Sequence, residues 1–349
     1  MGQAASYPRP ADLHPARGLY NGVETVLDFG DPAGEFAALG SGCGVFRPAW
    51  RAKISVTGKD HVRWLHNMVT NNVRDLPVNR GNYNFVLNAQ GRILGDIYIF
   101  NRGESFLVDT DYTQVEPLLT AMKRFIIMDK VEMAEAPILP LWGFCGPKAE
   151  EGMAAAGINA KDMEPLEIRE LAVDKLMVMV VRGPENKPGW YEVWVTVPEG
   201  DGGFIGGRFG EAKQVGAQAL EWWRVAHGIP HYGQDIRDRD LPQETGQTQA
   251  LNFNKGCYIG QEIVERIRSR GQVHRKFTGF EFEGSLPALG KIEQDGRTLA
   301  EITSAVAIPT SSGSRNIGLG YIRREVADAG PQVELAGLKA RIVDPPFVI

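Results

Sequence analysis

The segment from Tyr83 to Asp111 constrains the fold of this chain most, because it contains three β-rich runs separated by two turns. Its sequence is YNFVLNAQGRILGDIYIFNRGESFLVDTD, and the turn signals are NAQG and NRGE. Runs rich in aromatic and β-branched residues, bounded by turns that contain Asn and Gly, are typical of antiparallel hairpins. We therefore predict a three-stranded meander in this segment.

Helical patterns flank the meander on both sides. Before it, Lys53 to Val56 alternates polar and apolar residues, Gly58 interrupts the pattern, and Val62, Leu65 and Met68 follow at helical spacing. After it, apolar residues recur on one helical face from 115 to 126. The order of strand, helix, meander and helix predicts an α+β domain.

The pattern starts again at about residue 131 and changes once more near residue 273. LAVDKLMVMVVRG and WYEVWVTVP resemble paired strands, and a helix follows that ends at Gly228, a residue favoured after helix C-termini. From about 273 the chain has short strands and turns, which predicts a small β-barrel or sandwich. The first forty residues are rich in Pro, Gly and Ala, and we interpret them as an arm.

Composition and charge argue against a nucleic-acid-binding, a membrane-spanning and a secreted protein. The chain of 349 residues carries a net charge of −5, whereas phosphate-dominated binding of nucleic acid requires a basic face. No apolar run reaches the ~18 residues that span a bilayer, and no secretory pattern begins the chain. The three cysteines are widely spaced, which favours a reducing, cytoplasmic location over a disulfide framework.

One cysteine has a distinctive setting. In NKGCYIGQEIVERIRSRG, Cys257 precedes a predicted helix from about Gln261 to Ser269, and Lys255 lies two residues before it. The positive end of a helix and a nearby ammonium both favour the thiolate form of a cysteine. A small buried cysteine that fills a turn explains the same residues equally well.

Metal sites are not predicted. There is no Cys-x-x-Cys, and in HGIPH the Gly and Pro between His227 and His231 break the helical spacing of a ligand pair. An iron–sulfur cluster usually requires four thiolates, and this chain has three cysteines.

Three charged residues stand in unusual places. Asp96 and Glu192 lie in strands that are otherwise apolar and aromatic, and Arg224 lies on a helix beside two tryptophans. A flat heteroaromatic ligand could use carboxylates for its donor edge and aromatic rings for its faces. Asp96 could also be an edge residue that faces water, and Glu192 and Arg224 could form an ordinary ion pair.

The octapeptide KGCYIGQE resembles the signature of the YgfZ family of folate-binding proteins, which act in the maturation of iron–sulfur proteins. That family is similar to the aminomethyltransferase, or T-protein, of the glycine cleavage system. Four further segments carry the wider resemblance: KISVTGKDHVRWLHNMVTNNV, GRILGDIYIF, PGWYEVWV and WRVAHGIPHYGQDI.

The resemblance implies a fold and a set of bounds. Two α+β domains and a C-terminal β-barrel would form a three-domain cloverleaf around a central channel. Combined with the patterns above, it predicts an N-terminal arm at 1–44, a first α+β domain at 45–130 to which 227–272 returns, a second at 131–226 and a barrel at 273–349.

It also implies a site for tetrahydrofolate or a one-carbon derivative. Glu192 would hold the pterin edge with Arg224 close by, Asp96 would lie near the one-carbon end, and Tyr83 would be a further contact. Cys257 and Asp96 would be the catalytic candidates. The motif residues are Lys255, Gly256, Cys257, Tyr258, Gly260, Gln261 and Glu262.

Two departures from the T-protein order the functional hypotheses. The T-protein usually has two aspartates where this chain has Gly95 and Asp96, and its later motif lacks the cysteine. The first hypothesis is therefore a tetrahydrofolate-binding accessory protein for iron–sulfur protein assembly or repair, with assembly factors or client proteins as partners. The second is a folate-dependent aminomethyltransferase, which is also the enzyme activity we expect if the protein has one. The third, an RNA-interacting or tRNA-modification factor, depends on the basic residues between Arg266 and Lys276.

Overall fold

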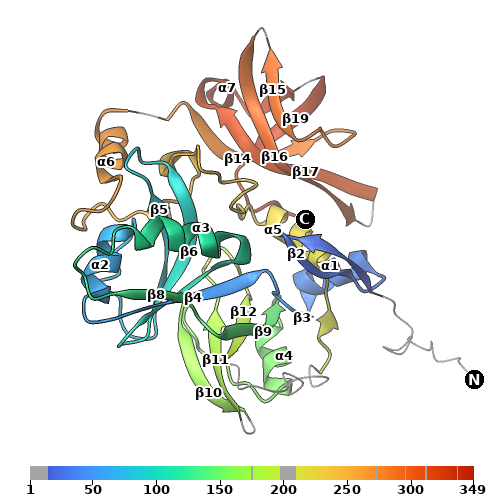
Figure 1. Cartoon of the computed structure of the whole chain (residues 1–349). Coiled ribbons are helices and arrows are strands. Elements are labelled where there is room, and N and C mark those ends of the chain that lie inside the picture. Colours follow the sequence, from blue (N-terminus) through green and yellow to red (C-terminus); the bar gives the residue numbers. More distant parts are fainter. Residues whose placement is uncertain are drawn as a thin grey trace, which may run out of the picture.

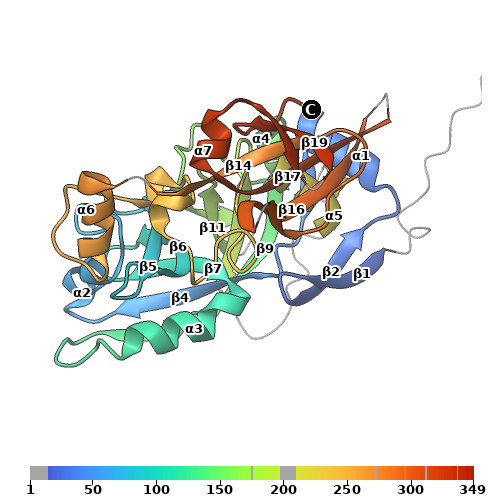
Figure 2. The same ribbon diagram turned by 90° about the horizontal axis from the view of Figure 1, so that it is seen from above.

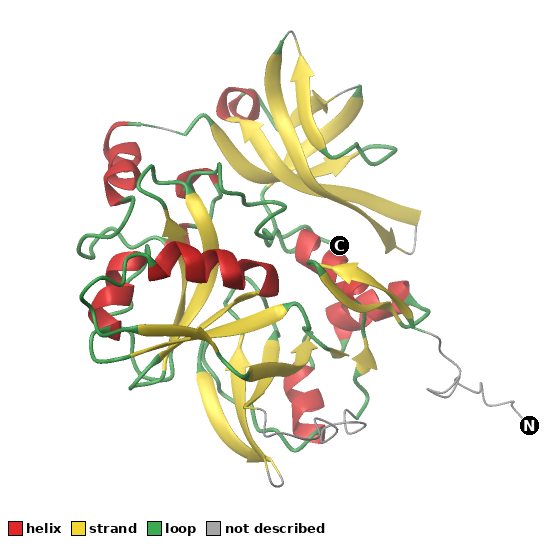
Figure 3. Cartoon of the chain, viewed as in Figure 1, coloured by secondary structure: helices red, strands yellow, loops and turns green. Residues whose placement is uncertain are grey.

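The computed structural model describes residues 15–173, 176–196, 210–271, 273–294, 296–310, 313–335 and 337–349. Within these ranges the strands form a two-stranded, a five-stranded and two six-stranded sheets (Figure 1). Helices lie beside strands through most of the molecule (Figure 3). The mixed α/β character expected from the sequence is confirmed.

The five-stranded sheet, which we name the first sheet, contains the predicted meander. Its order is β5–β6–β7–β4–β8 and every pairing is antiparallel. The strands are β4 (Arg51–Thr57), β5 (Gly81–Leu87), β6 (Ile93–Asn101), β7 (Phe106–Asp111) and β8 (Glu132–Glu135). The predicted flanking helices are confirmed as α2 (His61–Met68) and α3 (Tyr112–Lys123), although α3 ends before Phe125 and Ile126. Both helices pack apolar side chains, such as Leu65 and Leu118, against this sheet.

The second sheet has the order β10–β11–β12–β9–β3–β13. Its strands are β3 (Gly44–Phe46), β9 (Ile138–Cys145), β10 (Ile168–Val173), β11 (Leu176–Arg182), β12 (Tyr191–Thr196) and β13 (Lys213–Gln214), and α4 (Ala149–Ala155) packs beside it. The predicted pairing of the two hydrophobic strands is confirmed, since β11 and β12 pair antiparallel.

The first and second sheets are interleaved in sequence. β3 precedes the first sheet along the chain but pairs with β9 of the second, while β8 pairs with β4 of the first. Apolar side chains join the two sheets, and the rings of Phe100 and Trp194 meet edge to face with centroids 5.5 Å apart. The domain bounds given above remain a prediction.

The N-terminal segment is more regular than an arm. β1 (Ala16–Tyr20) and β2 (Val23–Asp28) form a hairpin, and α1 (Pro32–Ser41) follows; residues 1–14 lie outside the described part. The Asp31 carboxylate accepts a hydrogen bond from the Gly34 N–H at 2.9 Å, and Pro32 is the first helical residue. An N-cap carboxylate followed by proline is a helix-start signal, which the interpretation of these residues as an arm left out.

The C-terminal sheet is a half-barrel with the order β15–β16–β17–β14–β19–β18. Its strands are β14 (Arg275–Phe282), β15 (Gly290–Gln294), β16 (Arg297–Thr310), β17 (Gly313–Arg323), β18 (Gln332–Leu335) and β19 (Leu338–Val343), with the short helix α7 (Arg324–Asp328). Among the described residues the edge strands β15 and β18 are not paired with each other. The barrel expected from the sequence is therefore open.

Helix α5 (Ala217–Ala226) links this half-barrel to the rest of the molecule (Figure 2). Its residue Val225 packs against Ile317 and Leu319 of β17. The helix stops as predicted, because Gly228 adopts φ +68°, a left-handed conformation that favours glycine.

The chain from 229 to 271 then returns to the first sheet. Ile236, Tyr258 and Val264 form an apolar cluster with Phe85 and Leu87 of β5. Two short 3₁₀ turns lie in this segment, Pro242–Glu244 and Thr248–Ala250, and α6 (Gln261–Arg270) ends it. The predicted helix after Cys257 is confirmed.

Candidate functional site

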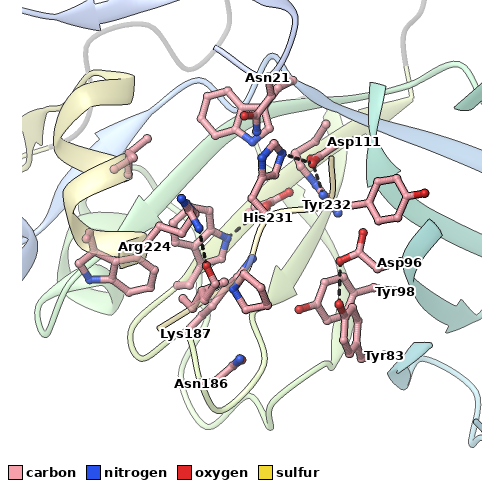
Figure 4. A pocket seen from close by; sticks show the side chains of 18 of the residues that line it. Asn21, Tyr83, Asp96, Tyr98, Asp111, Asn186, Lys187, Arg224, His231 and Tyr232 are labelled. Carbon is pink, nitrogen blue, oxygen red and sulfur yellow. Dashed lines mark hydrogen bonds and ion pairs between the residues drawn. The ribbon is translucent and has the colours of Figure 1, made fainter. Parts of the chain in front are cut away.

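A pocket lies where the two α+β sheets, the N-terminal hairpin and the loop after α5 meet (Figure 4). It holds about 780 Å³ of space unfilled by protein atoms, part of it open to solvent. The structure brings all four residues of the predicted folate set to its walls: Tyr83, Asp96, Glu192 and Arg224. Concave sites with aromatic walls and a few polar groups are typical of small-molecule sites.

Asp96 is a held carboxylate, not an edge residue facing water. It accepts a hydrogen bond from the Tyr83 hydroxyl at 2.7 Å and another from Gln114 Nε2 at 2.9 Å. Tyr83 reaches it from the neighbouring strand β5, which pairs antiparallel with β6. Burial, and then the charge of Asp96, raise the pKa of Tyr83, so this phenol stays protonated and donates.

Glu192 is fixed by two indoles of its own strand region. Its carboxylate oxygens accept hydrogen bonds from Trp190 Nε1 at 3.0 Å and Trp194 Nε1 at 2.7 Å, and the residue is 6% exposed. Lys187 lines the same pocket, with Nζ 5.2 Å from the centre of the Trp190 ring. Burial, and then the charge of Arg51, lower the pKa of Lys187.

Arg224 has partners other than Glu192. Its guanidinium forms ion pairs with Glu221 and, at 2.6 Å, with Asp235, and donates to the Ile229 carbonyl and the Ser304 hydroxyl. Burial alone would lower its pKa, but the two carboxylates raise it. Arg224 therefore ties α5 to the following loop and to β16, and lines the pocket from this fixed position.

A row of alternating charges was not predicted from the sequence, and its members Arg51, Asp111 and His231 line the pocket. Lys53 pairs with Asp109 at 2.6 Å, Arg51 pairs with Asp109 and with Asp111, and Asp111 contacts His231 at 2.8 Å. The signal was the alternation in LVDTD at the end of β7, opposite R-x-K in β4. Those two patterns meet only because β4 and β7 pair with Arg51 opposite Asp111.

Comparison with known proteins assigns the chain to a family. The family model described as the GCVT N-terminal domain matches residues 1–255, more than half of the chain. The chain belongs to the GCVT N-terminal domain family. The match ends at Lys255, two residues before Cys257.

Relatives of this GCVT-family chain extend over nearly its full length. An aminomethyltransferase of Caldanaerobacter subterraneus subsp. tengcongensis is 25% identical over 94% of this chain and 91% of its own. One of Bacillus subtilis is 24% identical over 94% of each chain. The crystal structure of the glycine cleavage system aminomethyltransferase T from Bartonella henselae superposes with a TM-score of 0.81 at 19% identity, covering 96% of this chain and 94% of that one.

The cysteine motif of this GCVT-family member lies apart from the pocket walls. Cys257 is exposed, whereas Cys43 and Cys145 are buried. Tyr258 packs against β5, and Gly260 has φ +82° just before Gln261 and Glu262 begin α6; Gly256 is exposed. The predicted reactive thiol is thus accessible, but it is not among the pocket residues.

Lys255 has a role different from the one predicted. The residue is 8% exposed, and its ammonium donates to the carbonyl oxygens of His66, Val69 and Asn71, where α2 ends. Burial, and then the charge of Arg74, lower its pKa to about 7. The lysine therefore fastens the motif loop to the end of α2, and its hydrogen bonds do not support the expected assistance to a Cys257 thiolate.

The structure also bears on the metal site, the basic segment and the membrane span considered in the sequence. Within the described ranges, no group of three His, Cys, Asp or Glu side chains is arranged to hold a metal ion. In the basic segment, Arg275 pairs with Asp240 and Glu244, and Arg268 lies 3.5 Å from Glu265. No helix of the described part is long and apolar enough to cross a membrane.

Proposed function

We propose that this protein binds tetrahydrofolate, or a one-carbon derivative of it, in the pocket and acts in folate-dependent aminomethyl transfer. The observation that carries the proposal is the convergence of Asp96 and Glu192, two carboxylates with fixed orientation, on the walls of one aromatic pocket. The curated aminomethyltransferases that resemble the chain over 94% of its length support the same activity. They move aminomethyl transfer ahead of the iron–sulfur role that the cysteine motif had placed first.

The pocket residues suit the chemistry of a reduced folate. The pterin ring has a flat face and a donor-rich edge; Trp190 and Trp223 offer faces, and Glu192 is the acceptor for the edge. Asp96, oriented by Tyr83, would lie at the one-carbon end. Tetrahydrofolate would supply the nitrogens that accept the one-carbon unit.

The proposal includes an arrangement of domains around the pocket. We place the pocket at the centre of a three-domain cloverleaf, with the domain bounds predicted from the sequence and a cytoplasmic location. The pocket walls come from the N-terminal hairpin, from β5–β7 with β4, and from β12 with α5.

Calorimetric titration with tetrahydrofolate tests binding, and a carrier protein loaded with an aminomethyl thioether tests transfer. We expect saturable binding that Glu192→Ala weakens and Glu334→Ala, an exposed change on β18, leaves alone. Formation of methylenetetrahydrofolate from the loaded carrier would establish transfer. Wild-type protein that binds no reduced folate would refute the proposal.

A second function is favoured by the exposure of Cys257 outside the pocket. We propose it as a folate-binding accessory role in the assembly or repair of iron–sulfur proteins, with the thiol as the group that meets the partner. The test is complementation of a deletion strain by Cys257→Ser, scored on the activity of iron–sulfur enzymes. Full complementation by a variant that still binds folate would dismiss this role and leave aminomethyl transfer untouched.

A further inference from the structure

A histidine–aspartate pair lies on the pocket wall beside the folate set. His231 comes from the loop after α5 and Asp111 from the end of β7, so the pair joins two distant parts of the chain (Figure 4). His231 Nε2 lies 2.8 Å from Asp111 Oδ2, so the ring donates its Nε2–H to the carboxylate. Arg51 Nη1 holds the other oxygen of Asp111 at 2.7 Å.

The backbone of His231 is fixed independently of its ring. Its N–H donates to Asp235 Oδ2 at 2.9 Å, and its carbonyl accepts the Asp235 N–H at 2.7 Å. Asp111 therefore holds the imidazole in one orientation. The backbone hydrogen bonds of the loop do not involve the ring.

The second ring nitrogen is left for a ligand. Among the described residues, His231 Nδ1 has no hydrogen-bond partner, and the side chain is 16% exposed while it lines the same pocket as Asp96. An imidazole with one nitrogen held by a carboxylate and the other at a pocket wall is an arrangement that proteins use to transfer protons.

Charged groups surround this imidazole on several elements. They are Asp111 on β7, Arg51 on β4, Glu221 and Arg224 on α5, Lys187 before β12 and Asp235 in its own loop, and the uncharged phenol of Tyr20 on β1 lines the same pocket. Burial alone would lower the pKa of His231, but the hydrogen bond and charge of Asp111 raise it above its ordinary value. The net effect of these neighbours favours the protonated imidazolium over the neutral ring.

We propose that His231 is a further catalytic residue of the pocket, which carries protons between the reacting groups, and that Asp111 is its positioning residue. This inference rests on the proposed aminomethyl transfer. In that reaction the carbon–sulfur and carbon–nitrogen bonds of the carrier's S–CH₂–NH₃⁺ group break, and two carbon–nitrogen bonds form to two folate nitrogens.

The protons of this reaction balance without an outside donor. Each folate nitrogen loses one proton; one of the two ends on the carrier sulfur, which becomes a thiol, and the other on the departing ammonia, which becomes ammonium. His231 gives the first proton from its imidazolium to a leaving group and regains one from a folate nitrogen. No oxidant or reductant is consumed.

Three variants separate a proton carrier from a structural contact. His231→Gln removes the titrating ring, Asp111→Asn keeps a hydrogen-bond acceptor without the charge, and His274→Gln is the matched change of an exposed histidine. Calorimetry with tetrahydrofolate, in two buffers of different ionisation enthalpy, measures the protons exchanged on binding and needs no turnover. Transfer rates from the loaded carrier are measured from pH 5.5 to 9.

We expect His231→Gln to bind folate within about threefold of wild type, to lose the pH-dependent proton exchange, and to transfer roughly 100-fold or more slowly. Asp111→Asn should move the titration step of the rate to lower pH by roughly one unit or more. His274→Gln should match wild type in every measurement.

The outcomes divide cleanly between the two proposals. If His231→Gln keeps both the wild-type proton exchange and the wild-type rate profile, His231 is a structural residue and this inference is wrong, while folate binding stands. If wild type binds folate without transfer, the proton exchange alone decides whether His231 meets the ligand. If wild type binds no folate, the proposed function fails and the inference falls with it.

Discussion

Gln114 holds Asp96 at both its backbone and its side chain. The Asp96 N–H donates to Gln114 Oε1 at 3.0 Å, and Gln114 Nε2 donates to Asp96 Oδ1 at 2.9 Å. Gln114 lies in the first turn of α3, which packs against the first sheet. The orientation of a pocket carboxylate is thus set by a helix that follows it in the chain, and the Tyr83 hydroxyl completes its surroundings.

Replacing Gln114 by Leu should weaken both the fold and the site. The change leaves the Asp96 N–H without its acceptor, which costs about 1–3 kcal/mol of unfolding free energy, and frees the carboxylate to rotate. Urea denaturation and folate calorimetry measure the two effects. Gln332→Leu, on the exposed edge strand β18, is the matched control and should change neither. A Gln114→Leu protein with wild-type stability would show that water replaces the amide.

Gly95 is required by the same packing. A Cβ atom at Gly95 would lie 2.8 Å from Leu118 Cδ2 and 2.9 Å from Gln114 Oε1, closer than such atoms approach. Restoring the paired aspartates by Gly95→Asp should therefore destabilise the protein by about 1–3 kcal/mol. Adding Gln114→Ala should recover part of that loss, because the two sites share a space. Strict additivity of the two changes in urea denaturation would contradict this account.

Glu192→Ala should weaken folate binding by about 1.5–3 kcal/mol, or roughly 10- to 100-fold, because a charged hydrogen-bonding group is lost. The two indoles that donate to Glu192 also lose their acceptor, so part of the effect comes from Trp190 and Trp194. Glu192→Gln keeps one acceptor oxygen and should fall between wild type and the alanine variant in calorimetry. Unchanged affinity in both variants would remove Glu192 from the binding surface.

The local patterns of the sequence predicted which helices and strands form better than they predicted which strands pair. The meander, α2, α5 and α6 follow from alternation, helical spacing and glycine stops, which act over a few residues. The N-terminal hairpin and α1 were missed, although Asp31 and Pro32 mark the helix start, because the Pro-, Gly- and Ala-rich composition was given more weight. The pairing of β3 with β9 spans about a hundred residues, and no local pattern encodes it.

The candidate site was also predicted in its residues but not in their long-range contacts. Asp96, Glu192 and Arg224 were singled out by their unusual places in the sequence, and the resemblance gave them a role and added Tyr83. The structure sets all four in one pocket. The partners of Arg224 and Lys255 could not be foreseen, since Asp235 and the carbonyls at the end of α2 reach them only through the tertiary fold. His231 of HGIPH was interpreted as a loop histidine and not as a metal ligand. Its hydrogen-bond partner, Asp111, is 120 residues away in the sequence.

Lys255 should make stability depend on pH in a definite direction. Its pKa is about 7 in the folded protein and 10.5 in an unperturbed lysine, so between these values the unfolded chain binds more protons. The contribution of Lys255 to the unfolding free energy should rise as pH increases through this window and be constant below it. Urea denaturation of wild type and Lys255→Met from pH 6.5 to 9.5 isolates that contribution. A difference that does not change with pH would mean that the buried ammonium keeps an ordinary affinity for its proton.

Cys257 should be the first of the three thiols to react. Burial, and then the charge of Glu151, raise the pKa of Cys43 to about 11, and burial raises the pKa of Cys145 well above its ordinary value, so neither forms much thiolate at neutral pH. Cys257 is exposed, and a reagent can reach it without any opening of the fold. Alkylation at pH 7.5 with mass-spectrometric assignment should label Cys257 alone in the folded protein and all three cysteines in urea.

The same thiol should be dispensable for folate. Because Cys257 does not line the pocket, Cys257→Ser should bind tetrahydrofolate within about twofold of wild type in calorimetry, whereas Glu192→Ala should not. A Cys257 that resists alkylation in the folded wild type would indicate a structural cysteine and remove the basis for a thiol-dependent partner role.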